Sequence, residues 1–364
     1  MIHIANPEIG DKELSCVKKV FDSGMLAQGE VVKKFEEEFA EYLGAGYGKA
    51  VSNGTAALDV ALKSLKIGKG DEVITSPFSF IASSNCILFQ GATPVFSDIK
   101  ADTFNLDPEL VLEKINDDTK AILAVHLFGQ PADMGALKEI AEDHDLYLIE
   151  DCAQAHGAEY DGQKVGSIGD VGTFSFYPTK NMTTGEGGMV VTDDEDIARR
   201  ADLVRDHGQS EKYTHDMLGY NLRMTNIAAA IGRCQLENLD KWNDKRIKNA
   251  ELLTESMKDI PGLTPPYVSD GVKHVFHQYV LRVEDDYPLS REELMDGLRE
   301  DGVGTAVHYP MPITDQPLYT EKGYSSSEYP RSVDASKKVM SLPIHPSVGE
   351  EDIGLMIESL ERRV

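Results

Sequence analysis

The sequence contains few cysteines, one tryptophan and no long apolar run. Its 364 residues include four cysteines, which stand singly, with no CxxC pair and no histidine at zinc-finger spacing; they are Cys16, Cys86, Cys152 and Cys234. This spacing excludes a disulfide-stapled domain or a zinc finger, so we expect reduced thiols and no metal site. Cys152 adjoins an aspartate, but a small apolar filler after a strand is the simpler interpretation.

Positive charge is also scarce. Lys and Arg total 36 against 62 Asp and Glu, a formal charge of −26. Nucleic acids and anionic membranes bind basic surfaces, so this balance argues against both as partners. No segment is apolar enough to suggest a membrane span, and the first residues, MIHIANPEIGDKE, lack the apolar core of a signal peptide. We therefore expect a cytoplasmic protein.

The middle of the chain alternates between two kinds of pattern. Short apolar segments, typical of buried strands, lie at 72–76, 94–99, 120–126, 146–151 and 171–177. Helical periodicity occurs at 11–23, 30–43, 80–89, 108–115, 134–143 and 195–205. This alternation predicts an α/β fold with a doubly wound, mostly parallel sheet.

The pattern changes around residue 245, where a long charged helix begins. Beyond it we expect strands at 275–283 and 305–308 and helices at 291–301 and 353–363. We therefore predict a large domain at 1–245, including an N-terminal helical segment, and a smaller α+β domain at 246–364.

The stretch 149–188 combines an aspartate and a lysine in a suggestive setting. An apolar strand ends at Asp151, and parallel strands of this kind deliver polar groups to the carboxyl edge of a sheet. Lys180 follows the next strand in a turn that leads to the glycines at 185, 187 and 188. A pyridoxal phosphate enzyme needs such a pair: an amine for the Schiff base and a carboxylate beside the ring nitrogen. Taken one at a time, Lys180 could be an ordinary surface lysine and Asp151 a cap at the end of a strand.

A turn that opens a helix offers a second element. Ser52 and Asn53 precede Gly54, Thr55 and Ala56, whose amides, with the Thr55 hydroxyl, could receive a phosphate at the positive end of the helix dipole. The alternative is an ordinary N-cap.

Two more residues follow turns or strands in the same layer. Phe80 is placed to stack on a planar ring, although a core aromatic is the default interpretation. His126, at the end of a strand, is more simply a hydrogen-bonded structural histidine.

With these pieces assembled, the chain closely resembles the DegT/DnrJ/EryC1/StrS aminotransferases, the sugar-modifying branch of fold type I pyridoxal phosphate enzymes. The matching motifs span nearly the whole chain in the family's order; they are SNGTAAL at 52–58, EDCAQAHGA at 150–158, FSFYPTKNMTTGEGG at 174–188, GYNLRM at 219–224 and HYPMP at 308–312. The resemblance implies a large domain with a mostly parallel seven-stranded sheet between helices, and pyridoxal 5′-phosphate as cofactor.

The resemblance also assigns roles to residues. Lys180 would form the Schiff base and move protons, and Asp151 would pair with the ring nitrogen. The other implied cofactor contacts are Gln154 to the ring hydroxyl, Phe80 on the ring face, and Gly54, Thr55, Ala56 and Ser175 around the phosphate.

Further roles concern the substrates and a second subunit. Asn221 and Arg223 resemble residues that reach into the partner's site, the first to the phosphate and the second to a substrate carboxylate, which implies a homodimer with shared active sites. His308 and Tyr309 match positions near the sugar. Where the family often has a histidine after this segment, the chain has Thr314 and Asp315.

The implied reaction is a transamination from L-glutamate or L-glutamine to the keto group of a nucleotide-linked sugar, in amino-sugar or polysaccharide biosynthesis. Two segments, DHGQ at 206–209 and HYP at 308–310, favour a 3-keto sugar over a 4-keto one. One alternative is a dehydratase or other lyase on the same scaffold, although related dehydratases carry histidine where this chain has Lys180. The other is a non-catalytic regulator, which would retain the fold alone.

Overall fold

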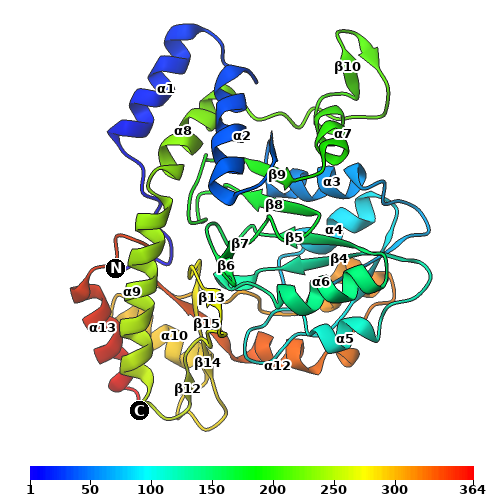
Figure 1. Ribbon diagram of the computed structural model, residues 1–364. Coiled ribbons are helices and arrows are strands. Elements are labelled where there is room, and N and C mark those ends of the chain that lie inside the picture. The colour runs from blue at the N-terminus through cyan, green and yellow to red at the C-terminus, as the bar shows by residue number, and fades with distance from the viewer.

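A seven-stranded sheet forms the centre of the molecule (Figure 1). The computed structural model describes all 364 residues. The strand order is β1-β9-β8-β5-β4-β2-β3. The bounds are β1 (Tyr47–Val51), β2 (Glu72–Thr75), β3 (Thr93–Phe96), β4 (Thr119–Val125), β5 (Tyr147–Asp151), β8 (Val171–Ser175) and β9 (Gly188–Thr192). Only β9 runs antiparallel to its neighbours, so the predicted seven-stranded, mostly parallel sheet is confirmed.

Helices cover both faces of this sheet, which explains why its strands are apolar throughout. One face packs against α3 (Gly54–Ser64), α4 (Ala82–Phe89) and α7 (Glu195–Arg205). The other packs against α2 (Glu30–Leu43), α5 (Pro108–Leu112), α6 (Met134–Asp143) and α8 (Asn226–Leu236). Within β4, Leu123 faces the first core, whereas Ile122 and Ala124 face the second. Because successive side chains of a strand point to opposite faces of the sheet, each strand contributes residues to both cores.

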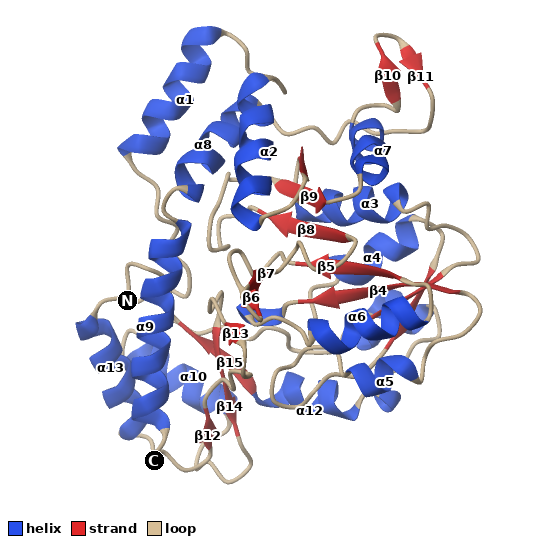
Figure 2. Cartoon of the chain, in the orientation of Figure 1, coloured by secondary structure: helices blue, strands red, loops and turns tan.

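The C-terminal part builds a separate core around a small antiparallel sheet, ordered β12 (Leu263–Thr264), β14 (Tyr279–Val283) and β15 (Val339–Leu342). Its apolar residues come from these strands and from α9 (Leu239–Met257), α10 (Arg291–Glu300) and α13 (Glu350–Glu361). Figure 2 shows these elements beside the large sheet. No helix in the structure combines the length and the apolar character that crossing a bilayer requires.

Several shorter elements complete the chain. The helix α1 (Asp11–Ser23) packs against α8 at the edge of the molecule (Figure 1). The remaining elements are α11 (Pro317–Glu321), α12 (Pro330–Lys338), β6 (Glu159–Tyr160), β7 (Gln163–Lys164), β13 (Val272–Lys273) and the short 3₁₀ turns at Leu127–Gly129, Ile313–Asp315 and Ser326–Glu328.

Two segments differ from what the sequence patterns predict. After α7 the chain forms a hairpin of β10 (Gln209–Glu211) and β11 (Thr214–His215), for which no strands were expected. The expected strand at 305–308 is wrong: only Ala306 makes a bridge, to Ser341. The chain cannot continue as a strand there because Pro310 and Pro312 have no amide hydrogen to donate.

Candidate active site

A cavity of about 780 Å³ opens at the carboxyl ends of the central strands. Such an edge is where α/β proteins bind ligands, because loops from several strands meet there. The structure brings most of the predicted site residues to this one cavity; its lining includes Gly54, Thr55, Phe80, Asp151, Gln154, Ser175, Lys180, His308 and Tyr309. They come from motifs that are up to about 250 positions apart in the sequence.

Lys180 lies in the turn that follows β8, and its amide donates to the carbonyl of Tyr177. Burial lowers the pKa of its amine to about 8, although the nearby Asp151 carboxylate acts in the opposite direction. A lysine with such a pKa is partly neutral near physiological pH, so its nitrogen lone pair is available as a nucleophile or base.

Asp151 ends β5 and is only 5% exposed. Its carboxylate accepts a hydrogen bond from Ser83 Oγ at 2.8 Å and another from the amide of Ala153 at 3.1 Å. Burial raises its pKa above the ordinary value, while these hydrogen bonds and Lys180 limit the rise. The carboxylate is thus held in one orientation, and a cation placed in the cavity would stabilise its charged form.

Gln154 and two aromatic residues form another part of the wall. The amide of Phe128 donates to Gln154 Oε1 at 2.8 Å, and Gln154 Nε2 donates to the Tyr309 hydroxyl at 3.1 Å. These contacts fix the orientation of the Gln154 side chain. The Phe80 ring lies 6.4 Å from the Tyr309 ring and is 56% exposed, so it is free to contact a ligand.

The N-terminus of α3 meets the end of β8 at the cavity. Gly54 lies so close to Ser175 that an added Cβ would be 2.5 Å from the serine Cβ, so no larger residue fits there. The first helical turn leaves the amides of Gly54 and Thr55 without backbone partners. The structure departs from our prediction at Ala56, because Asn53 Oδ1 caps its amide at 2.8 Å and Ala56 does not line the cavity. The N-cap and the predicted anion site would therefore share this turn, using different amides.

Asn221 and Arg223 do not line the cavity of this chain. Their segment runs beside β1, where Arg223 forms a bridge with Val51 and Asn221 with Asp206. The Arg223 guanidinium pairs with the Asp206 carboxylate and lies 3.1 Å from His207 Nδ1. A single chain therefore does not supply these two side chains to its own site.

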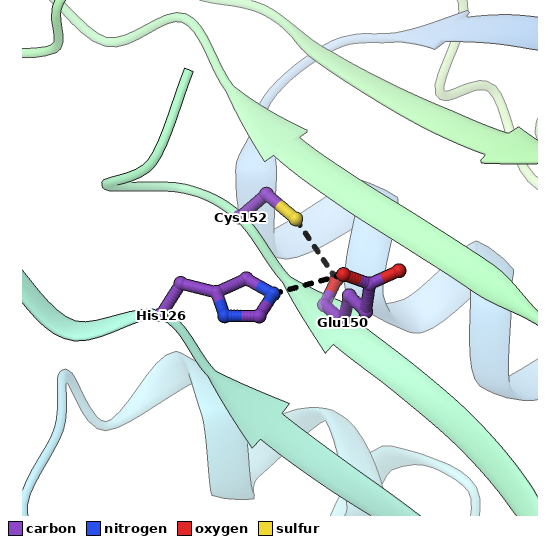
Figure 3. Close-up of side chains that lie close together, drawn as sticks. All are labelled: His126, Glu150 and Cys152. Carbon is purple, nitrogen blue, oxygen red and sulfur yellow. Dashed lines mark hydrogen bonds and ion pairs between the residues drawn. The ribbon is translucent and has the colours of Figure 1, made fainter. Parts of the chain in front are cut away.

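A buried cluster beneath the cavity joins His126, Glu150 and Cys152 (Figure 3). His126 Nδ1 accepts from the Ala132 amide at 2.9 Å, so Nε2 carries the proton and donates to Glu150 at 3.0 Å. Burial would raise the pKa of Glu150, but His126 and backbone amides outweigh it and lower the pKa. Those amides belong to Gly166, Ile168 and Gly169. Because the imidazole and the carboxylate already bond to each other, the cluster links the ends of β4 and β5. His126 is therefore a hydrogen-bonded structural histidine, as predicted.

Sequence analysis missed several residues of the cavity. Ser83 contacts Asp151 from the first turns of α4, and His277 lines the cavity with Nδ1 unpaired. Burial lowers the pKa of His277 well below its ordinary value, with Lys180 adding to the effect. The other unpredicted lining residues include Ile4, Ala5, Tyr177, Thr179, Glu186 and Gln278. A serine within SFIASSN and a histidine within HVFHQYV carry no local signal of a site.

An α/β protein that holds an amine, a buried carboxylate and a helix N-terminus around one such cavity falls in the class of pyridoxal phosphate transferases of fold type I. Comparison with known proteins gives the same answer. A model of the DegT/DnrJ/EryC1/StrS aminotransferase family matches residues 7–361. The chain therefore belongs to this family of pyridoxal phosphate-dependent aminotransferases, and the resemblance drawn from its motifs is confirmed.

Individual relatives cover nearly the whole chain. It is 41% identical over 358 residues to a "Pleiotropic regulatory protein" of Geobacillus stearothermophilus, with 97% of this chain and 94% of the relative covered. It is 39% identical over 333 residues to the dTDP-3-amino-3,4,6-trideoxy-alpha-D-glucose transaminase of Streptomyces venezuelae, covering 91% and 86%. The crystal structure of S. venezuelae DesV in complex with a ketimine intermediate superposes with a TM-score of 0.93 at 38% identity, covering 96% and 93%.

Proposed function

We propose that the protein transfers an amino group from L-glutamate or L-glutamine to a keto group of a nucleotide-linked sugar, with pyridoxal 5′-phosphate as cofactor. The observation that carries the proposal is the presence of Lys180 and Asp151 in one large cavity of a chain that belongs to this family. The printed name of the S. venezuelae transaminase includes a nucleotide-linked amino sugar, which supports this substrate class.

The residues of the cavity fit this cofactor. The Gly54 and Thr55 amides, the Thr55 hydroxyl and Ser175 suit a phosphate dianion, and the missing side chain of Gly54 lets the start of α3 lie close enough to Ser175 for both to face the cavity. Asp151 suits a protonated ring nitrogen, Gln154 the ring hydroxyl and Phe80 the ring face. When bound, the cofactor supplies an electron sink for cleavage of bonds at the amino-bearing carbon.

Lys180 would hold the cofactor covalently and then act as a base. In this role its amine would take up the proton of the donor's amino-bearing carbon and later release it within the cavity. The lowered pKa suits both steps, because the amine can be neutral when it accepts and charged when it donates. His308 and Tyr309, which also line the cavity, would orient the sugar, for which we favour a 3-keto group.

We propose that the working form is a homodimer. Asn221 and Arg223 would complete the partner's cavity, the first at the phosphate and the second at the donor's carboxylate. An arginine is suited to this because its guanidinium binds a carboxylate through two parallel hydrogen bonds.

A subunit-mixing experiment tests the shared site. Lys180→Ala and Arg223→Ala are each expected to have less than about a hundredth of the wild-type turnover. After subunit exchange, the mixture should regain about a quarter of the wild-type turnover, because each hybrid dimer has one site with both residues intact. Differently tagged copies verify the exchange. Mixing Lys180→Ala with Asp151→Ala is the matched control, since both side chains belong to one cavity and no hybrid site is complete. Recovery in the control as well, or in neither mixture, would contradict a site shared in this way.

The regulatory name of the Geobacillus relative favours one alternative, a protein that binds a ligand without turning it over. A lyase on the same scaffold is another. Retention of Lys180, Asp151 and Gln154 in the cavity supports aminotransfer over both.

The deciding experiment is a turnover assay with a panel of nucleotide-linked 3-keto and 4-keto sugars. We expect one mole of 2-oxoglutarate for each mole of amino sugar when glutamate is the donor. Glutamine is tested in parallel, with mass spectrometry of the sugar product. A deoxygenated sugar without 2-oxoglutarate would establish the lyase, and cofactor binding without any product would establish the regulator.

We also propose to divide the chain at residue 245, within α9. The N-terminal part of α9 contributes Leu239 to the core of the large sheet, whereas Ala250, Leu253 and Met257 belong to the C-terminal core. Residues 1–245 and 246–364 would then be the large and small domains.

A further inference from the structure

Two cysteines that are far apart in the sequence meet where α1 packs against α8. Cys234 Sγ lies 2.7 Å from Cys16 Sγ, although 218 positions separate the residues. The sulfurs of a disulfide are about 2.05 Å apart, so a shift of less than about 1 Å would join this pair. The two other cysteines have no sulfur neighbour: Cys86 Sγ donates to the Ser83 carbonyl and Cys152 Sγ to the Glu150 carbonyl.

The two sulfurs differ in how deeply they are buried. Cys234 is 2% exposed, and burial, followed by its hydrogen bond to Cys16, raises its pKa to about 12. It therefore keeps its proton and donates it to Cys16, which is partly exposed. Cys16 is thus the sulfur that a small oxidant can reach.

Charged side chains of both signs surround the pair. Glu13, which is 6% exposed, contributes to the raised pKa of Cys234. Lys12 lies one helical turn before Cys16, and Arg233 directly precedes Cys234; both interact electrostatically with the two cysteines. Their carboxylate partners are Glu237 at 2.5 Å and Glu38 at 2.6 Å. The thiolate is the reactive form of cysteine, and Cys16 is the more accessible of the two sulfurs.

We propose that Cys16 and Cys234 are an oxidation site that closes to a disulfide and joins α1 to α8. With hydrogen peroxide as oxidant, the Cys16 thiolate attacks one peroxide oxygen, the O–O bond breaks, and a sulfenic acid and water form. The Cys234 sulfur then attacks the Cys16 sulfur, the S–O bond breaks, and a second water leaves with the Cys234 proton. Two thiols and one peroxide give one disulfide and two waters, so two electrons pass to the peroxide. A dithiol reductant reverses the reaction by exchange.

The crosslink would join two helices whose preceding segments bear on the candidate active site, one in this chain and, under the proposed function, one in the partner's. The chain before α1 contributes Ile4 and Ala5 to the cavity wall, and α8 begins directly after the segment that holds Asn221 and Arg223. Joining them closes a long loop, which stabilises the folded state chiefly by restricting the unfolded chain.

The experiment treats the purified full-length protein with hydrogen peroxide, then alkylates free thiols under denaturing conditions and maps peptides without reductant. We expect the Cys16 and Cys234 peptides to be joined, and alkylated thiols to fall from four to two. The thermal midpoint should rise by roughly 5 °C, and dithiothreitol should reverse the shift. Cys86 and Cys152 are internal controls, because both are fully buried and burial raises their pKa well above the ordinary value.

Cys16→Ser and Cys234→Ser variants complete the design. Each should give no crosslinked peptide and no thermal shift with peroxide, while its untreated midpoint stays close to that of the reduced wild type. The proposal is overturned if all four thiols of the wild type survive, if Cys16 is oxidised to a sulfinic acid without a crosslink, or if the crosslink joins two chains on a non-reducing gel.

Discussion

Replacing Lys180 with alanine is expected to lower the turnover by about 10⁴-fold, because one change removes both the covalent attachment and the general base. Its turnover is measured beside that of Lys69→Ala, in which an exposed lysine on a surface turn is removed and activity should stay unchanged. The thermal midpoint of Lys180→Ala should not fall, since burying an ammonium is unfavourable and the alanine relieves that cost. Retention of more than about a tenth of the activity would contradict the assigned role.

The lowered pKa of Lys180 gives the same prediction a pH dependence. The amine can attack only when neutral, so the rate at which the apoprotein binds pyridoxal phosphate covalently should rise with pH and level off above about 8. Rapid-mixing absorbance at several pH values measures this rate. An exposed lysine would instead give a rate that still rises between pH 9 and 10. In Lys180→Ala the absorption change should be absent.

Asp151→Asn is expected to lower the turnover by about 10²- to 10³-fold, the cost of removing one buried electrostatic partner of the reacting group. The amide keeps the size of the side chain, and its oxygen can still accept from Ser83, but the negative charge that we propose to pair with the ring nitrogen is gone. Because burial already raises the pKa of Asp151, the neutral residue should leave the thermal midpoint unchanged or higher.

Two measurements separate this loss of charge from a loss of structure. The same substitution at the exposed Asp117 should change neither turnover nor midpoint. The dissociation constant for pyridoxal phosphate should rise for Asp151→Asn and not for Asp117→Asn. If Asp151→Asn lost activity only together with a large fall in thermal midpoint, a structural role would explain it instead.

Much of the fold follows from local pattern. The helices α1, α2, α6 and α7 begin and end where their periodicity predicts, because amphipathic spacing and flanking glycines or capping residues fix the ends of a surface helix. Five of the seven strands of the large sheet, β2, β3, β4, β5 and β8, were predicted to within a few residues, since each is an apolar run between turns. The short β15 was missed because Met340 and Leu342 are held by the C-terminal core, and the short α12 because its Ala335 packs into a core of the large sheet; neither has a strong pattern of its own.

The residues of the candidate site also form two groups, those that local motifs predict and those that only the tertiary structure brings to the cavity. Lys180, Asp151 and Gln154 stand in motifs that are recognisable along the chain, and all three line the cavity. Ser83 is there only because α4 lies beside the end of β5, a relation that spans 68 positions. The same limit applies to Ala56, whose amide could have faced either a phosphate or the Asn53 side chain until the turn geometry was known.

Residue type and local spacing were enough to predict most of the strand and helix pattern and the family motifs, including the motifs that contain Lys180 and Asp151. The tertiary structure decided which groups share a cavity, that Arg223 pairs with Asp206 outside it, and that Cys16 meets Cys234. Such contacts arise from the packing of whole helices and strands, and two thiols separated by 218 positions carry no local sign that they will touch.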